Sequence, residues 1–242
     1  MDTVSAILEP QHPPVGEPLH LDLAQLPLRE VNRLLHAADL TAQDVLITHP
    51  AGLHNVAVGL AAPVRVTISG HVGYYAAGMN QRAEITITGN AGTGVAENMM
   101  SGRVVVQGSA SQSAGATAPG GLLVIHGDAA ARCGISMKGV DIVVGGGIGH
   151  MSAFMAQAGT LVVRGDAGES LGDSIYEARL YVRGEVASLG TDCVQKSMRP
   201  EHHSELARLL AEAGYDDDPA TYRRYGSARR LYHFHVDNAG AY

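Results

Sequence analysis

Aliphatic residues recur with one fixed period through the middle of this chain. A glycine stands every nineteen residues, and in each copy an aliphatic side chain lies four and two residues before it, between columns of mixed polarity. Alternation over about five residues is typical of a short strand with one buried face. The seven glycines are Gly70, Gly89, Gly108, Gly127, Gly146, Gly165 and Gly184.

Two further columns obey the same period. The residue two positions after each glycine is apolar, and the residue seven positions after it is Gly, Ala or Thr. Nineteen residues are too few for a strand–helix–strand unit, which needs about 30. The pattern therefore predicts an all-β fold, a single-stranded right-handed parallel β-helix of about seven coils. Stacked about 4.8 Å apart, seven coils make a prism on the order of 30 Å long.

The flanking segments are predicted to close the two ends of this prism. Residues 1–43 form an N-terminal extension with a helix after Pro27, and residues 44–198 form the β-helix. The first coil is degenerate: Ile47, Leu53 and Val58 are expected on inward columns, with Ala51 in place of the glycine. Residues 199–214 are predicted to form a C-terminal capping helix, and residues 215–242 a tail rich in Arg and Tyr.

Composition agrees with a soluble, self-sufficient domain. A chain of 242 residues with 45% apolar content can bury a core without disulfides or metal. Its two cysteines, Cys133 and Cys193, are too few for a zinc or iron–sulfur site and indicate thiols in a reducing compartment. No signal peptide or apolar run of membrane-spanning length is visible, so we expect a cytoplasmic location and no membrane association. A net charge of −7 disfavours nucleic-acid binding.

Candidate chemistry is sparse. The glycines between Gly145 and Gly149 lack the spacing and the Lys-Ser/Thr of a phosphate-binding loop, and fit turn geometry better. Asp128 and Asp166 share one column, but Gly147 stands between them, so no acidic ladder for hydrolysis is present. The twelve histidines show no spacing that completes a metal site. We therefore expect no catalytic, cofactor-binding or metal-ligating residue on this chain.

The C-terminal tail has an unusual composition. Tyr and Arg are enriched there, which is typical of a docking surface, although a tail folded back on the prism accounts for it equally well. The hypothetical docking residues are Tyr222, Arg223, Arg224, Tyr225, Arg229, Arg230 and Tyr232.

The repeat resembles a known family. A strand followed by Gly-x-x-Gly and a further glycine occurs, for example, at Gly70, Gly73 and Gly78. Residues 45–213 thereby resemble the GXGXG domain of the glutamate synthase large subunit, which also occurs in the C subunit of formylmethanofuran dehydrogenase. The segments PLREVNRLLH and YGSARRLYHFHVDNA resemble the free-standing form of this domain, found in split glutamate synthases such as N-methylglutamate synthase (methylamine–glutamate N-methyltransferase).

This resemblance implies a supporting role in one-carbon and methylamine metabolism. In that family the β-helix carries no catalytic residue, and neighbouring units hold the cysteine nucleophile, the FMN and the iron–sulfur cluster. The expected partners are an amidotransferase-like subunit and an FMN/iron–sulfur synthase subunit, joined with this chain in a hetero-oligomer. Two alternatives stay open: a subunit of a formylmethanofuran dehydrogenase or formyltransferase/hydrolase complex, and a self-contained β-helix enzyme or binding module.

Overall fold

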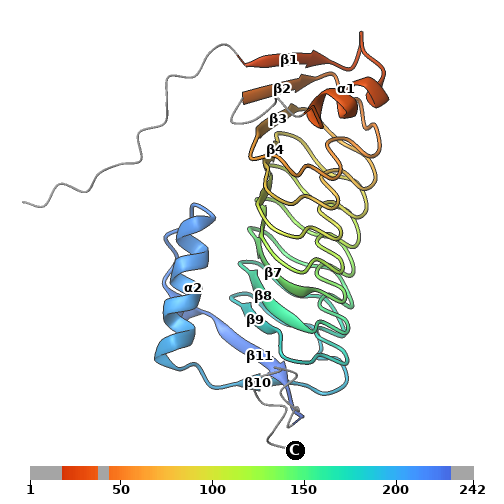
Figure 1. Ribbon diagram of the computed structural model, residues 1–242. Coiled ribbons are helices and arrows are strands. Elements are labelled where there is room, and N and C mark those ends of the chain that lie inside the picture. The colour runs from red at the N-terminus through yellow and green to blue at the C-terminus, as the bar shows by residue number, and fades with distance from the viewer. Residues whose placement is uncertain (1–17, 38–43, 230–242) are drawn as a thin grey trace, which may run out of the picture.

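Successive coils of the chain stack into an elongated prism with one long sheet along its side (Figure 1). The computed structural model describes residues 18–37 and 44–229. Its eleven-stranded sheet has the order β1-β2-β3-β4-β5-β6-β7-β8-β9-β11-β10. The strands are β1 (Leu19–Asp22), β2 (Asp44–Thr48), β3 (Arg65–Ser69), β4 (Glu84–Ile87), β5 (Arg103–Val106), β6 (Leu122–Ile125), β7 (Lys138–Val144), β8 (Ala158–Val163), β9 (Arg179–Val182), β10 (Cys193–Lys196) and β11 (Arg223–Ser227).

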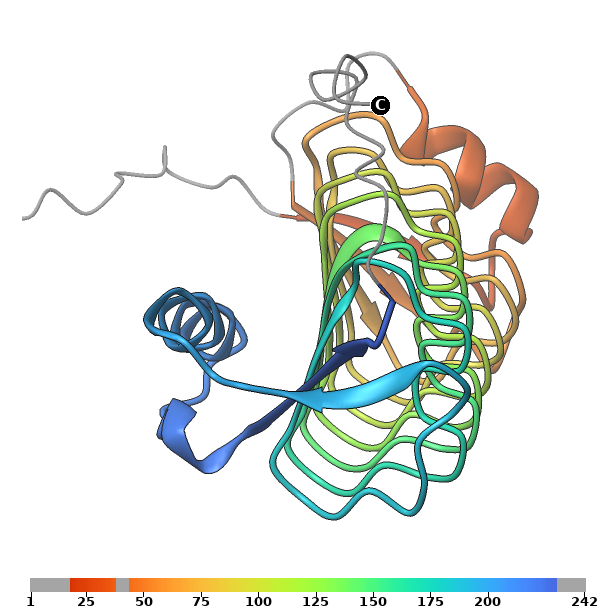
Figure 2. The ribbon, with the colours of Figure 1, turned by 90° about the horizontal axis from the view of Figure 1, so that it is seen from below.

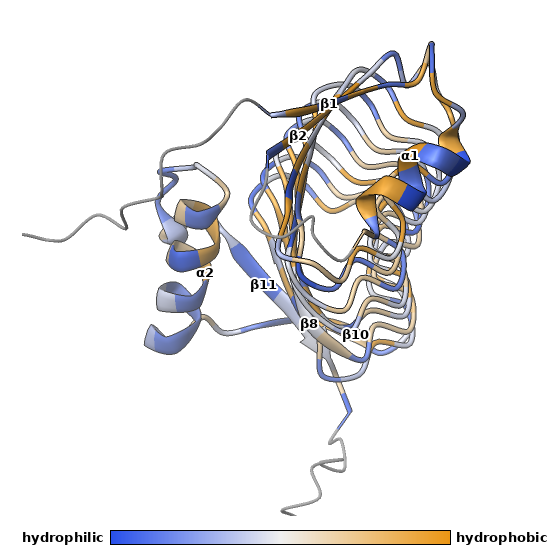
Figure 3. Cartoon of the chain, turned by 45° about the horizontal axis from the view of Figure 1, so that its top comes forward, coloured by the Kyte–Doolittle hydropathy of each residue, from blue (hydrophilic) through white to orange (hydrophobic). Residues whose placement is uncertain are grey.

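The predicted right-handed parallel β-helix is confirmed. From β3 to β9 each strand pairs in parallel with the strand nineteen residues later, as Val66 does with Ile85. The column two residues after each glycine forms a second, thinner ladder of single parallel bridges, from Val72 to Val186. The two aliphatic columns of β3 to β9 are at most 1% exposed, and hydrophobic residues run along the strands (Figure 3). Burial of these columns between coils is therefore the main source of stability.

The column of small residues marks a left-handed bend. Ala77, Ala96 and Ala153 are fully buried with φ of +56°, +56° and +57°. Glycine fills the same column in three other coils. Larger side chains are excluded there for two reasons, the lack of space and the positive φ. The sequence pattern predicts only the first.

Side chains at the corner after the glycine tie one coil to the next. Asn90 Oδ1 accepts the N–H of Ser109 at 2.9 Å, and Asp128 Oδ1 accepts the N–H of Gly147 at 2.8 Å. Asp166 repeats the contact with Glu185 at 2.8 Å. The aspartates of this column therefore act as acceptors for backbone amides one coil away. Gly147 interrupts the ladder because it has no side chain to offer Asp166.

The first coil is longer than the others. β2 pairs with β3 at an offset of twenty-one residues, so that Ile47 lies opposite Ile68 instead of Val66. The prediction that Leu53 points inward was wrong, since it is 38% exposed. Val56 and Leu60 fill the interior of this coil instead.

Helix α1 (Leu28–Leu35) closes the N-terminal end of the prism (Figure 1). Val31 and Leu35 are buried in the main core. Asn32 holds the helix to the first coil, because its side chain donates to Asn55 O at 2.9 Å and accepts from Ala57 N at 3.0 Å. This end therefore has the predicted helical cover.

The second helix lies elsewhere than expected. α2 (Pro200–Glu212) begins at the predicted proline, and the chain reverses at Gly214 with a φ of +83°. However, α2 runs alongside the sheet instead of crossing the end of the prism (Figures 1 and 2). The last coil is instead followed by β11 and β10, which pair antiparallel next to β9. The interpretation of residues 199–214 as an end cap was wrong. The apolar side of α2 packs instead against apolar residues on the outward side of the sheet.

Replacing Ala153 tests the left-handed column. We expect Ala153→Val to lower the free energy of unfolding by about 2–4 kcal/mol, because a β-branched side chain meets both overpacking and the unfavourable positive φ. Ala153→Gly should change it by less than about 1 kcal/mol, since glycine accepts this backbone. Urea unfolding followed by circular dichroism measures both. Equal effects of the two variants would contradict the assignment.

The ladder of side-chain acceptors predicts a second effect. Asp128→Ala should destabilise the fold by about 1 kcal/mol, because the Gly147 amide loses its acceptor. Asp216→Ala, at an exposed aspartate of the C-terminal segment, is the matched control and should stay within about 0.5 kcal/mol of the parent. Chemical denaturation of both proteins makes the comparison, and indistinguishable midpoints would refute the role given to Asp128.

Candidate functional site

The two thiols are unsuited to chemistry. Both are buried, and burial raises the pKa of Cys133 to about 12 and that of Cys193 to about 11. A thiolate is the nucleophile and metal ligand, so neither residue can serve at neutral pH. Among residues 18–37 and 44–229, no three His, Cys, Asp or Glu side chains are placed to hold a metal ion.

Three of the described histidines make polar contacts within the fold, in separate places along the prism. His49 Nδ1 lies 2.8 Å from Asp22 Oδ1 at the N-terminal end, and His202 Nδ1 accepts the Arg199 amide at 3.1 Å where α2 begins. His126 Nδ1 lies 2.7 Å from Tyr215 Oη. The pair His233 and His235 lies outside the described residues. These histidines therefore lie too far apart along the prism to form one metal site.

Helix α2 covers the outward side of the sheet over β5 to β9. The outward column three residues before each glycine is valine in four of these strands and Tyr181 in the fifth, and with the apolar side of α2 it forms a second hydrophobic cluster. Its members on α2 are Leu206, Leu209 and Leu210. The helix therefore packs on the outside of the prism through a second small hydrophobic core.

Charged pairs border this second core. Arg179 Nη2 lies 2.6 Å from Glu205 Oε1, and Tyr181 Oη donates to the same carboxylate at 2.7 Å. Arg208 lies 3.4 Å from Asp141, and Arg103 donates to the Glu212 carbonyl at 2.7 Å. In three of these strands, the residue five positions before the glycine is charged and binds a polar group of α2.

The segment after α2 returns along the other border of the sheet. The Arg164 guanidinium lies over the Tyr215 ring, with its Cζ atom 3.8 Å from the ring centroid. Asp217 accepts from Arg164 Nη2 at 2.9 Å, from Arg183 Nη1 at 2.9 Å and from Tyr222 Oη at 2.8 Å. The hydrogen bond from Arg164 is the largest cause that lowers the pKa of Asp217 to about 2. This network fastens residues 215–222 to the coils.

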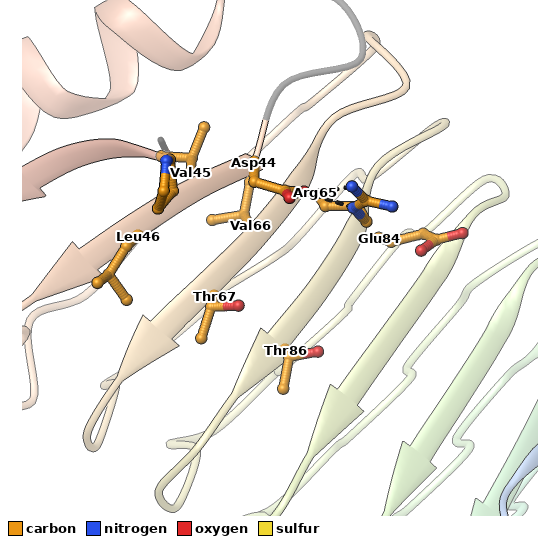
Figure 4. Close-up of a pocket in the computed structure, with 9 residues that line it drawn as sticks. Asp44, Val45, Leu46, Arg65, Val66, Thr67, Glu84 and Thr86 are labelled. Atoms are coloured by element: carbon orange, nitrogen blue, oxygen red, sulfur yellow. Dashed lines mark hydrogen bonds and ion pairs between the residues drawn. The ribbon is translucent and has the colours of Figure 1, made fainter. Parts of the chain in front are cut away.

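Beyond the end of α2, the same side of the sheet is hollowed and uncovered by any described helix. A hollow of about 420 Å³ lies over β2 to β4, lined by Leu46, Thr67 and Thr86 in the centre and by Asp44, Arg65 and Glu84 along one side (Figure 4). We call these six residues the open face. Arg65 pairs with Asp44 through two hydrogen bonds, one of them 3.0 Å long.

Comparison with known proteins places the chain in a family. No protein-family model matches it. Protein GlxC of Rhizobium meliloti (strain 1021) is 61% identical over 225 residues, which cover 92% of this chain and 99% of GlxC. The chain belongs to the GlxC family. Because the match spans nearly the whole of both chains, the prism, α2 and most of the C-terminal segment are expected in this relative as well.

In this GlxC-family chain, two tyrosines of the described part of the C-terminal tail are buried. Tyr222 and Tyr225 are each 3% exposed, so the hypothesis that they dock partners was wrong. Tyr225 belongs to β11, which lies between β9 and β10. A tyrosine-rich segment can dock a partner or form a buried strand. Here it forms the buried strand β11, which pairs with the edge of β9.

The described tail arginines are also engaged within the chain. Arg223 donates to the Gly184 carbonyl, Arg224 to the Ser197 carbonyl at 3.1 Å, and Arg229 pairs with Asp192. Arg230 and Tyr232 lie outside the described residues, so their proposed role in docking stays a prediction. Deleting residues 222–242 would remove a strand of the sheet and is therefore no clean test of docking.

Sequence reasoning missed the open face and the Asp217 network. A signal for the first was present: the outward column changes from Thr67 and Thr86 to valine at the third coil. That change marks where the cover begins. The second had no signal, because Arg164, Tyr215 and Asp217 meet only after the chain reverses behind α2.

No described helix is long and apolar enough to cross a membrane.

The Asp217 network predicts an acid-sensitive contribution to stability. The pKa of Asp217 is lower in the folded chain than in the unfolded one, so its contribution is complete above about pH 4 and is lost as pH falls through about 2. Asp217→Asn should cost on the order of 2 kcal/mol at pH 7. The difference from the parent should vanish near pH 2, as measured by urea unfolding across pH. A pH-independent difference would contradict this assignment.

Proposed function

We propose that this chain is a non-catalytic structural subunit of a glutamate-synthase-like complex, of the N-methylglutamate synthase type. In this proposal it braces an amidotransferase-like subunit against a synthase subunit that carries FMN and an iron–sulfur cluster, in the cytoplasm. The chain would be an enzyme subunit without reacting groups of its own. The supporting resemblance is that of the repeat and of both terminal segments to the free-standing GXGXG domain.

The observation that carries this proposal is how the described polar side chains are used. The aspartates of the corner column accept backbone amides, and the arginines along the sheet pair with α2 and the segment after it. The thiols are buried. A prism whose coils are bonded to each other at every level resists bending, which is the property that a spacer between two catalytic units requires.

Co-purification tests this function directly. We expect the tagged chain, expressed at its natural level in its native cells, to retain an amidotransferase-like chain and an FMN/iron–sulfur chain. The sample should show flavin absorption, and mass spectrometry should identify both partners. An untagged strain processed in parallel is the control.

Two other outcomes would contradict the proposal. An amidohydrolase-like partner without flavin would indicate a formyltransferase/hydrolase complex of the formylmethanofuran dehydrogenase type. A colourless chain that purifies alone would exclude both complexes and favour a self-contained binding module or enzyme. Each result is distinguished by the chains in the purified sample and by its absorption spectrum.

A further inference from the structure

The outward side of the sheet ends in two positive charges. Arg224 of β11 lies directly opposite Tyr181 of β9, and Lys196 of β10 lies directly opposite Arg224. Residues that lie directly opposite each other in a sheet share one face. Because Tyr181 belongs to the hydrophobic cluster under α2, Lys196 and Arg224 also lie on the outward side. We call these two residues the basic pair.

The basic pair has no counter-charge among the described residues. Arg224 Nε donates to the Ser197 carbonyl at 3.1 Å, and no described acceptor binds its terminal nitrogens or Lys196 Nζ. Both side chains are half-buried. Burial lowers the pKa of Arg224, and the charges of Arg199 and Arg179 lower it further. Like charges directly opposite each other destabilise a sheet, so this arrangement favours the binding of a negative charge.

The acids at the start of α2 are already paired. Glu205 Oε1 lies 2.6 Å from Arg179 Nη2, and Glu201 Oε1 lies 2.8 Å from Arg199 Nε. Each of these carboxylates thus neutralises an arginine outside the basic pair. The chain as a whole has a net charge of −7, yet at this end of the sheet the two positive charges of the basic pair remain in excess.

Helix α2 adds a hydrogen-bond donor beside the basic pair. His202 is 5% exposed and lies on the same side of α2 as Leu206, which packs on the sheet. Its Nδ1 accepts the Arg199 amide at 3.1 Å, which assigns the ring proton of the neutral imidazole to Nε2. No described residue accepts from Nε2. Burial lowers the pKa of His202, and the charges of Arg224 and Arg199 lower it further, so a neutral ring lies close to the basic pair.

We propose that Lys196, Arg224 and His202 form a binding site for a phosphate group. Such a group carries a charge of about −1.5 to −2 at neutral pH and strong acceptor oxygens. The three side chains match it, since they supply two positive charges and only donors. The lysine acts as a point charge, whereas the planar guanidinium can donate through two nitrogens at once. The site lies within one chain, so it does not depend on the complex proposed above.

The NMR signal of one lysine reports on binding directly. The chain has two lysines, Lys138 and Lys196, so reductive methylation with isotope-labelled formaldehyde gives two lysine signals and keeps both charges. Inorganic phosphate is titrated into the full chain at an ionic strength held constant with KCl. We expect a saturable shift of the Lys196 signal and none of the Lys138 signal. An unmoved Lys196 signal, or equal shifts of both, would overturn the inference.

A matched pair of lysine variants gives a second measurement. Phosphate that binds the folded chain alone should raise the midpoint of thermal unfolding of the parent. Lys196→Gln should weaken binding by about tenfold, as expected for the loss of a charge-assisted hydrogen bond. Lys138→Gln makes the same change at an exposed lysine and should bind phosphate as the parent does. Equal binding by the two variants would contradict the assignment.

The arginine is tested through the same lysine signal. In Arg224→Gln, the Lys196 signal should require about ten times more phosphate for the same shift. Arg132→Gln, at an exposed arginine of a corner, is the control and should behave as the parent does. Circular dichroism shows whether each variant is folded, and if Arg224→Gln is not, the lysine variants decide.

A second ligand identifies the source of the phosphate group. Inorganic phosphate and glycerol 3-phosphate are titrated in parallel into the parent chain. Equal affinities indicate free phosphate and tighter binding of the ester indicates a phosphorylated metabolite, and either result supports the site. Because these assays use the isolated chain, their failure is distinct from a failure of the co-purification test.

Discussion

The stacking of identical positions, one coil above another, constrains everything else in this protein. Gly89 donates its amide to Gly70 O at 3.1 Å and Gly127 donates to Gly108 O at 2.9 Å, so the corner repeats as a column of backbone bonds. A side chain at Gly89 would lie 2.6 Å from the Gly70 carbonyl oxygen. From β3 to β9 the period therefore stays at nineteen, because a slip by one residue would turn the aliphatic columns outward.

This constraint separates the inside of the prism from its outside. Inward columns are satisfied by neighbouring coils alone, as Ile85 is by the residues above and below it. Side chains of the outward columns point away from the neighbouring coils. They are buried only where another part of the chain packs over them. Where they are valine, α2 covers them, and where they are threonine, they remain available. The functional proposals concern this outer surface because it is the part that the repeat leaves undetermined.

The fold was predictable in detail wherever the period operates. Strands β3 to β9, the glycine corners and the small column all follow from residues nineteen apart. The start of α2 at Pro200 follows instead from the proline, which favours the first turn of a helix. The first coil was predicted out of register, because two extra residues between Ile47 and Ile68 leave no mark in its composition. Of the candidate site, the docking role of Tyr222 failed since Tyr is common both on interfaces and in buried strands.

The sequence alone determined the stacked coils of β3 to β9, because each repeat can bury its apolar columns only against copies of itself. It also determined that residues 200–212 form a helix with one apolar side. Only the tertiary structure decided where that side is buried. The apolar side of an amphipathic helix packs against another apolar surface. Both the end of the prism and the side of the sheet have such a surface. The continuous valine column, joined with charges that match Glu205 and Arg208, made the side of the sheet the more stable choice.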